Sequence, residues 1–318
     1  KLQIINTVER AVERLGNIGE KDKACLYHYI SIEFFLLGLF NKALKYALNA
    51  LGIFKKVLLA NHPVLAAAYN NIGSTYQGLG KHEKALEYLF KALEIVKKIL
   101  PACYPDLATL YNNIGCAYGG LGEHEKELEY LFKALEIVKK ILPACYPDLA
   151  ALYNNIGYAY GGLGEHEKEL EYLFKALAIR KKVLPADHPD LATAYNNIGC
   201  TYEELGEHEK ELEYLLKALE IRKEVLSADH PDLALTYNNI GCAYGELGEH
   251  EKELEYLFKA LAIRKKVLPA DHPDLAALYN NIGCAYGRLG EHEKELEYLF
   301  KALAICKKGL SADHPDLA

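Results

Sequence analysis

HPDLATAYNNIGCTYEELGEHEKELEYLLKALEIRKEVLSAD, residues 188–229, is a 42-residue stretch that recurs along the chain. Its copies begin at His62, Tyr104, Tyr146, His188, His230 and His272, and a seventh begins at His314. Six near-identical copies therefore span residues 62–313, and residues 314–318 are the start of a further, truncated copy. A fixed period of this size is typical of stacked units that each pack only on their neighbours. The fold is therefore predicted from one unit.

Capping signals and apolar periodicity predict two helices in each unit. Pro189 suits the first turn of a helix, where its missing N–H costs nothing, and Asp187 or His188 can cap that turn. Gly206 stands where a left-handed residue commonly ends a helix. Residues 207–226 then show apolar side chains on two sides at helical spacing. We expect this second helix to be buried against its own partner and against the next unit.

A glycine lies in the middle of the first helix. Gly199 costs roughly 0.5–1 kcal/mol there relative to alanine. Every full copy nevertheless repeats the glycine, at Gly73, Gly115, Gly157, Gly241 and Gly283. We therefore expect two helices to approach each other closely at this position.

The two ends of the chain depart from the repeat. Residues 1–19 lie outside the period and carry one apolar stripe, so they are predicted to form a capping helix. Residues 20–61 match the repeat when shifted by 42, as in Tyr27 with Tyr69. They are predicted to form a degenerate repeat. The chain begins at Lys1 and contains no methionine, so we expect it to be a segment of a longer protein.

Composition argues against nucleic-acid-binding, membrane and disulfide-linked proteins. The net charge of −7 and pI near 6.0 give no basic surface for nucleic acid or an anionic membrane. No apolar run approaches the roughly 20 residues that span a bilayer. Cysteine alternates with serine, tyrosine or aspartate at equivalent positions, so the eight cysteines do not form a disulfide framework. This pattern favours a reducing, cytoplasmic location.

The unit resembles the tetratricopeptide repeat. The residues that carry the resemblance are Tyr195, Ile198, Gly199, Tyr202, Gly206, Leu215 and Ala218. The usual period of that family is about 34 residues, and the longer period here resembles the 42-residue repeats of kinesin light chains and other near-identical natural arrays. One departure is a glutamate, Glu211, where the family has a small residue such as Ala85 in the first full copy. The resemblance implies an all-α fold, a right-handed superhelical α-solenoid of antiparallel helix pairs.

Catalytic and metal-binding patterns are absent from the sequence. HEKE, at the start of the second helix, lacks the second histidine of the HExxH zinc motif. We interpret these histidines as helix-start residues on a polar surface. The GGLGE segments lack the lysine and serine or threonine of a phosphate-binding loop. We therefore expect a non-enzymatic protein with no cofactor and no bound metal.

An asparagine pair occurs in every full copy. The pairs are Asn70 and Asn71, Asn112 and Asn113, Asn154 and Asn155, Asn196 and Asn197, Asn238 and Asn239, and Asn280 and Asn281. The residues one turn later, which include Tyr158 and Cys200, should lie beside them. In the resembled family the first helix lines a concave groove that contacts peptides, and amides can bind an extended backbone. The alternative is that one or both asparagine side chains satisfy backbone or inter-repeat hydrogen bonds. A third option is that one asparagine of each pair is structural and the other faces the groove.

These observations favour a scaffold that binds protein or peptide segments on its concave face. Domains of the resembled family that grip a terminal carboxylate use lysine and arginine on this face, and those positions are Asn, Thr or Ala here. The variable ends of the first helices are acidic on balance in the second half of the chain. A polar, neutral-to-basic segment is therefore the expected partner. The alternative is a structural spacer that self-associates end to end through the last helix, Glu291–Leu310. Family analogy adds the sensor arm of a larger signalling protein.

Overall fold

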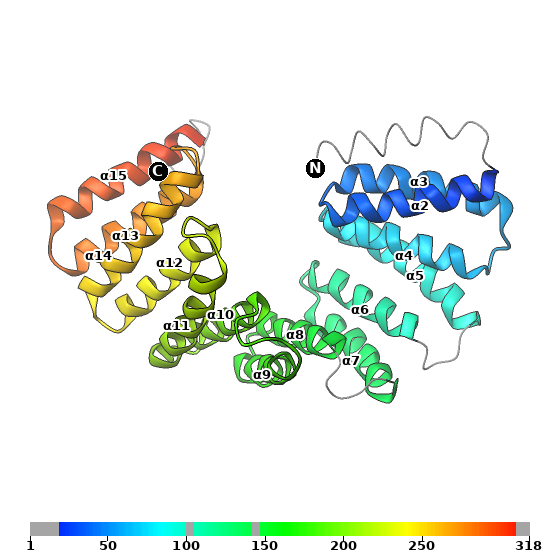
Figure 1. The fold of residues 1–318 in the computed structure, drawn as a ribbon, viewed down its shortest axis with the longest axis horizontal. Helices are drawn as coiled ribbons and strands as arrows, with labels where there is room; N and C mark the ends of the chain where they lie inside the picture. The colour runs from blue at the N-terminus through cyan, green and yellow to red at the C-terminus, as the bar shows by residue number, and fades with distance from the viewer. Residues whose placement is uncertain (1–18, 100–104, 142–146, 310–318) are drawn as a thin grey trace. The chain divides into compact units, whose positions relative to one another are not determined.

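The computed structural model of the chain describes residues 19–99, 105–141 and 147–309 (Figure 1). Over these residues the backbone forms α-helices and no strands. The capping helix predicted at residues 1–19 falls, apart from Gly19, outside the described residues. The truncated copy at residues 314–318 also falls outside them.

The helices follow one another in pairs, and we call the first of each pair an A helix and the second a B helix. The A helices are α2 (Glu20–Leu36), α4 (Pro63–Gly78), α6 (Pro105–Gly119), α8 (Pro147–Gly162), α10 (Pro189–Glu204), α12 (Pro231–Glu246) and α14 (Pro273–Arg288). The B helices are α3 (Phe40–Val57), α5 (His82–Ile99), α7 (His124–Ile141), α9 (His166–Val183), α11 (His208–Val225), α13 (His250–Val267) and α15 (His292–Gly309).

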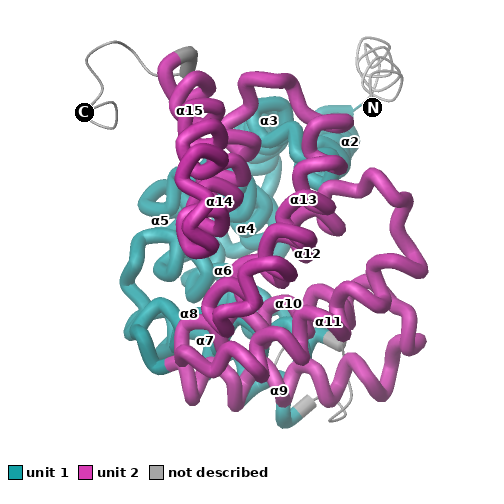
Figure 2. The backbone as a smooth tube through the Cα atoms, turned by 90° about the vertical axis from the view of Figure 1, so that its left-hand side faces the viewer, with its two compact units in different colours: residues 1–165 teal, residues 166–318 magenta. Residues whose placement is uncertain are grey.

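The chain divides into two compact units, residues 1–165 and 166–318 (Figure 2). Within each unit, every helix packs on the helix that follows it in the chain. Successive A helices also touch, as α4 does with α6 and α12 with α14. The predicted all-α solenoid of antiparallel helix pairs is therefore confirmed.

Helix α10 shows how an A helix begins and ends. The Nδ1 atom of His188 accepts a hydrogen bond of 3.1 Å from the backbone N–H of Asp190, so the histidine is the capping residue. At the other end, the N–H of Glu207 donates to the carbonyl of Tyr202 at 2.9 Å. This Schellman pattern requires a left-handed residue, and Gly206 has a φ of +69°. The turn then reverses the chain into α11.

The two helices of a pair touch at the mid-helix glycine. A Cβ atom added to Gly199 would lie 3.0 Å from side-chain carbons of Leu215 and 3.4 Å from the carbonyl oxygen of Glu211. The shorter distance is closer than the roughly 3.5–4.0 Å at which carbon atoms pack best. The same approach recurs between Gly115 and Leu131, Gly241 and Leu257, and Gly283 and Leu299. The predicted close approach is confirmed, and it joins the A and B helices of one pair.

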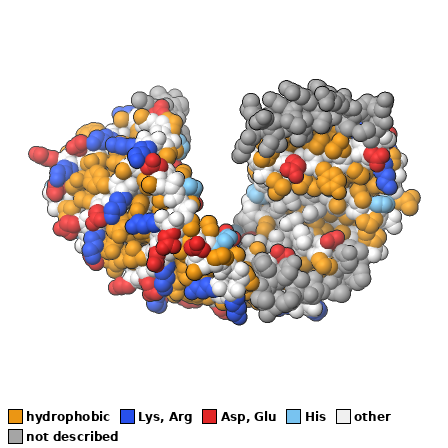
Figure 3. All heavy atoms as spheres, in the orientation of Figure 1, with side chains coloured by type: hydrophobic (Ala, Val, Ile, Leu, Met, Phe, Trp, Pro, Cys, Tyr) orange, Lys and Arg blue, Asp and Glu red, His pale blue; other side chains and the backbone are white. Residues whose placement is uncertain are grey.

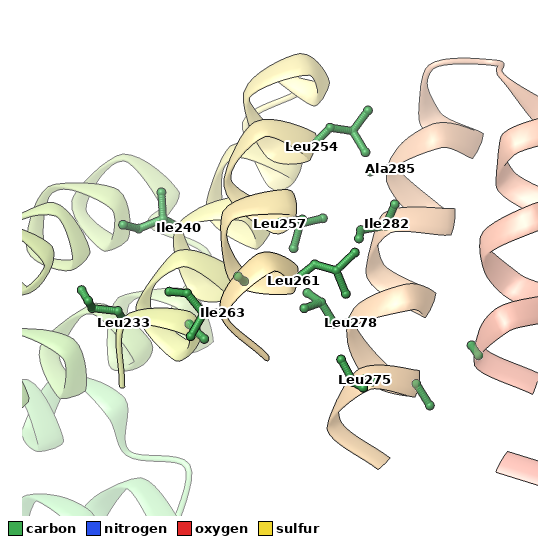
Figure 4. Close-up of a cluster of buried hydrophobic side chains, with 14 of the residues drawn as sticks. Leu233, Ile240, Leu254, Leu257, Leu261, Ile263, Leu275, Leu278, Ile282 and Ala285 are labelled. Atoms are coloured by element: carbon green, nitrogen blue, oxygen red, sulfur yellow. The ribbon is translucent and has the colours of Figure 1, made fainter. Parts of the chain in front are cut away.

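Aliphatic side chains fill the space between one pair and the next. Leu257 and Leu261 of α13 face Leu278 and Ile282 of α14 in the second unit (Figure 4). Leu257 and Ile282 are fully buried. Burying one such side chain contributes about 1.5–3 kcal/mol. A B helix is therefore buried on two sides, against its own A helix and against the next one.

The start of a B helix contains a histidine–glutamate pair in which the glutamate is buried and the histidine is half-buried. In α11, His208 Nδ1 lies 2.9 Å from Glu211 Oε2, and the two side chains are only 23% and 1% exposed. Equivalent pairs are His124 with Glu127, His166 with Glu169, and His250 with Glu253. These histidines begin the B helices, as interpreted, but they are half-buried beside a buried glutamate rather than lying on an open polar surface. In the first full copy Ala85 replaces the glutamate, and the buried Nδ1 of His82 has no hydrogen-bond partner.

The outward side of the B helices carries ion pairs. Lys217 Nζ lies 2.5 Å from Glu213 Oε1, and the two side chains are 40% and 57% exposed. The same amine lies 4.4 Å from the ring centroid of Tyr214. An exposed pair of this kind contributes at most about 1 kcal/mol. Charged side chains of both signs lie among apolar ones on the visible surface (Figure 3), as expected of a solvated face.

Replacing Gly199 by leucine should lower the free energy of unfolding by about 1–3 kcal/mol, because the new side chain would have to displace Leu215. Urea unfolding followed by circular dichroism measures this change. The exposed Glu220 offers a matched control, and Glu220→Leu should change the free energy by no more than about 0.5 kcal/mol. Equal stability of the two variants would contradict the close approach.

Replacing Glu211 by glutamine keeps the shape of the side chain and removes its buried charge. Burial raises the pKa of Glu211 in the folded chain, although the hydrogen bond with His208 opposes this shift. The folded state therefore binds the proton more tightly than the unfolded state, and stability falls as pH rises between the two pKa values.

We expect Glu211→Gln to be more stable than the wild type at about pH 7. The two proteins should have the same stability at about pH 4, where the glutamate of the wild type is also neutral. Urea unfolding across this range measures the difference. Glu213→Gln, at an exposed position, serves as the control and should show no such pH-dependent gain. A wild-type chain as stable as Glu211→Gln at neutral pH would argue against a destabilising buried charge.

Candidate functional site

The predicted asparagine pairs lie on one side of the A helices. We call this side the A face and define it by the repeat positions of Ala67, Asn70, Asn71 and Ser74. Their spacing of three, four and seven residues places them on one helical face. Ala67 is exposed and the other three are half-buried. The A face is therefore accessible along much of α4.

Asparagines of consecutive repeats hydrogen-bond to one another. Asn113 Nδ2 donates to Asn70 Oδ1 at 2.9 Å, and Asn155 Nδ2 donates to Asn112 Oδ1 at 2.9 Å. In the second unit Asn281 Nδ2 donates to Asn238 Oδ1 at 3.1 Å. At these three junctions the second asparagine of one repeat thus donates to the first asparagine of the preceding repeat. In the degenerate first repeat, Ser31 Oγ takes that role and accepts from Asn71 Nδ2 at 2.5 Å.

We call this row of hydrogen bonds between asparagines of consecutive repeats the ladder. In several repeats the residue one turn after the pair also contacts it. Asn113 Nδ2 lies 3.4 Å from Ser74 Oγ, and Asn155 Nδ2 lies 3.6 Å from Cys116 Sγ. Asn239 Nδ2 likewise lies 3.9 Å from Cys200 Sγ. Burial raises the pKa of the Cys116, Cys200 and Cys242 thiols to about 11. They are therefore neutral near pH 7 and lack the thiolate that nucleophilic chemistry needs.

The remaining candidate residues lie at the same repeat positions with different surroundings. Asn154 and Asn197 are half-buried, whereas Asn280 is exposed. Asn280 Nδ2 lies 3.9 Å from Cys284 Sγ in its own helix. Tyr158 is 46% exposed, more than the half-buried Cys116 and Cys200 at its equivalent positions. Asn196 is buried, and its amide oxygen accepts from Arg222.

A groove of about 400 Å3 opens beside the ladder in the first unit. Its apolar lining includes Ile32, Phe35 and Val96. Its polar lining includes Asn70 and Asp106. An apolar pocket with a few convergent polar groups is the usual form of a binding site. We call it the first groove.

A second groove, of about 360 Å3, lies one repeat further along the same unit. Its lining residues Pro105, Ala108, Thr109, Asn112, Val138, Asp148 and Leu152 are the repeat equivalents of Pro63, Ala66, Ala67, Asn70, Val96, Asp106 and Leu110 in the first groove. The shared part of the two grooves therefore arises from the same packing of an A helix, its B helix and the next A helix, and α2 adds Ile32 and Phe35 to the first groove alone.

Arginine occupies the equivalent place in the second unit. Arg222 of α11 stands at the repeat position of Val96 and Val138, and it is as buried as they are. Its Nη1 atom donates to Asn196 Oδ1 at 3.4 Å and to the hydroxyl of Thr236. Burial lowers the pKa of the Arg222 guanidinium. Neither Arg222 nor the grooves were predicted, although the change from valine to arginine at this position is visible in the sequence.

The described residues contain neither a metal-binding cluster nor a membrane-spanning helix. Their histidine, cysteine, aspartate and glutamate side chains form no group of three that could hold a metal ion. None of the described helices has the length and apolar content needed to cross a bilayer.

Arg288 joins two carboxylates of the preceding repeat, at 2.9 Å from Glu253 Oε1 and 3.2 Å from Glu246 Oε1.

Solved structures with the same fold share little sequence with this chain. Nearly identical repeats from a kinesin light chain protein of Podosopora anserina are 24% identical, with a TM-score of 0.59, over 64% of this chain and 97% of that one. A signal-transduction ATPase with a tetratricopeptide repeat sensor, from Pyrococcus horikoshii, is 21% identical with a TM-score of 0.70, over 94% of this chain and 45% of that one. A Rap protein complexed with Competence and Sporulation Factor is 19% identical with a TM-score of 0.59, over 93% of this chain and 78% of that one.

Family models give a direct assignment. Among curated proteins, none matches this sequence. A model of the tetratricopeptide repeat, however, matches residues 22–98, 148–224, 212–266 and 254–308, and a second model with the same description matches residues 108–138. The tetratricopeptide fold generally serves as a non-catalytic scaffold for protein interactions. The chain belongs to the tetratricopeptide repeat family.

Proposed function

We propose that this chain binds an extended segment of a partner protein along its A face and catalyses no reaction. The observation that carries the proposal is the recurrence of one groove in consecutive repeats of the first unit. A single cavity can arise from imperfect packing. Two cavities that share equivalent lining positions form a periodic surface, which suits a ligand that is itself periodic, such as a polypeptide.

The lining of the grooves suits side chains of such a segment. Val96 and Leu110 provide apolar contact in the first groove, as Val138 and Leu152 do in the second. Burying apolar surface there would contribute about 25 cal/mol per Å2. The ladder uses only part of the hydrogen-bonding capacity of each amide, which has two donors and two acceptor lone pairs. The first asparagines, Asn70 and Asn112, would bind the backbone or polar side chains of the segment.

Filling the groove region should block this binding. Thr109 is exposed and stands at the repeat position of Ala67, and it lines both grooves. Thr109→Trp should weaken binding of a peptide library by tenfold or more, on the order of 1.4 kcal/mol. Fluorescence polarisation measures the affinities.

Glu94→Trp provides the matched control, because Glu94 is 69% exposed on the B helix α5. This variant should bind as the wild type does. Circular dichroism melting of both variants separates a loss of binding from a loss of folding. Peptides that bind Thr109→Trp as tightly as the wild type would remove the grooves from the binding site.

A second candidate function is self-association through α15. Leu296 and Phe300 are 55% and 64% exposed there, whereas Leu254, the equivalent of Leu296 in α13, is 9% exposed beneath α14. A second copy of the chain could cover these two side chains. Light scattering should then show association that rises with concentration and is lost in Phe300→Glu. A strict monomer at high concentration would exclude this function.

A further inference from the structure

The second unit shows how a guanidinium group is bound at the groove position. Arg222 is 6% exposed, although it is a charged side chain on a B helix. Besides Asn196 and Thr236, its Nη1 atom contacts the backbone carbonyl of Asp232 at 3.4 Å. A buried charge is tolerated only where its hydrogen-bonding capacity is met. The neighbouring A helices therefore provide an array of acceptors that suits a guanidinium.

The next repeat binds its arginine with a carboxylate. Arg264 is the equivalent of Arg222, and its Nη1 atom hydrogen-bonds to Asp274 Oδ2. Asp274 is in turn the equivalent of Asp232. In two consecutive repeats, the arginine at this position thus donates hydrogen bonds to acceptors on the two flanking A helices. These acceptors are an asparagine oxygen, a backbone carbonyl or an aspartate.

The grooves of the first unit carry equivalent acceptors without the arginine. Asn70 and Asp106 line the first groove at the repeat positions of Asn196 and Asp232. Asn112 and Asp148 do the same in the second groove. Valine takes the place of arginine in both, and this leaves spaces of about 400 Å3 and 360 Å3.

We propose that the first and second grooves each bind an arginine side chain of the partner segment. This proposal rests on the proposed function and adds the chemistry of the partner. The guanidinium would reach the asparagine oxygen and the aspartate carboxylate, as Arg222 and Arg264 do in the second unit. Leu110 and Leu152 replace Thr236, so the methylenes of the incoming side chain would pack on an apolar wall.

The separation of the grooves sets the spacing of the two arginines. The bond between Asn113 and Asn70 shows that successive A helices are direct neighbours, and packed helices lie about 8–10 Å apart. A polyproline II segment advances about 3.1 Å per residue with three residues per turn. Side chains three positions apart therefore lie on one side of it, about 9 Å from each other. Arginines at such a spacing can enter both grooves together.

The test uses a fluorescent proline-rich peptide with two arginines three positions apart. The matched probe carries citrulline at both positions, which keeps the shape of the side chain and removes its charge. The arginine peptide should bind the full chain at least about tenfold more tightly, because charge-assisted hydrogen bonds are roughly twice as strong as neutral ones. A lysine version should bind less tightly than the arginine peptide, because ammonium lacks the planar fork of a guanidinium.

Variants of the chain then locate the binding. Val96→Arg and Val138→Arg place in each groove the side chain that occupies it in the second unit, and each should weaken binding of the arginine peptide by tenfold or more. Val57 is 44% exposed on α3, and Val57→Arg adds the same charge away from the grooves. It should leave binding within about twofold.

Two further variants test the proposal even if the valine substitutions prevent folding. Asp106 and Asp148 are exposed, so Asp106→Asn and Asp148→Asn should fold normally. Each should weaken binding of the arginine peptide by about two- to fivefold, as expected for an exposed ion pair. Neither should affect the citrulline peptide.

The outcomes separate this proposal from the proposed function. Equal affinity of the arginine and citrulline peptides would overturn the assignment of arginine while leaving peptide binding intact. Unchanged binding by folded Val96→Arg and Val138→Arg would also overturn it. If neither peptide binds the folded chain, the assignment fails, and the library titration with Thr109→Trp decides the proposed function separately.

Discussion

The close contact between the mid-helix glycine of an A helix and a leucine of its B helix is the constraint on which the rest of the structure depends. At Gly199 there is no room for a Cβ atom without movement of Leu215. This contact brings the two helices of a pair together, and an aliphatic core packs each pair on the next. The A helices are consequently brought close enough for Asn113 to reach Asn70.

The asparagine ladder and the grooves are two results of the same spacing. The ladder joins consecutive A helices near their middle, and a groove forms where an A helix, its B helix and the next A helix leave a gap. Near-identical repeats can differ in function through a single position. Valine at residues 96 and 138 leaves the groove open, whereas arginine at residue 222 fills it and donates hydrogen bonds to Asn196 and Thr236.

Local signals in the sequence were sufficient to predict the fold. The histidine cap and the helix-ending Gly206 act through residues adjacent in the chain, and Gly199 acts on the B helix that directly follows its own A helix. Because the repeat has a fixed period, the structure predicted for one unit applies to every copy.

The candidate site depends on interactions between repeats, so it was predicted only in part. The position of the asparagine pairs was identified, but the choice between ligand binding and inter-repeat hydrogen bonding requires the distance between helices. The role of Arg222 depends on a long side chain that reaches between two A helices, and no pattern within one repeat reveals it. Glu211 departs from the family pattern in the sequence, but its burial beside His208 depends on how the B helix packs on its neighbours.

The most direct test of this account is a methyl NMR titration of the chain with the two-arginine peptide. The account predicts that the methyl signals of Val96 and Val138 shift as the peptide binds, because these side chains line the two grooves. The signals of Val225 and Val267, which are exposed on α11 and α13, should remain in place. Unchanged Val96 and Val138 signals at saturating peptide would contradict the account.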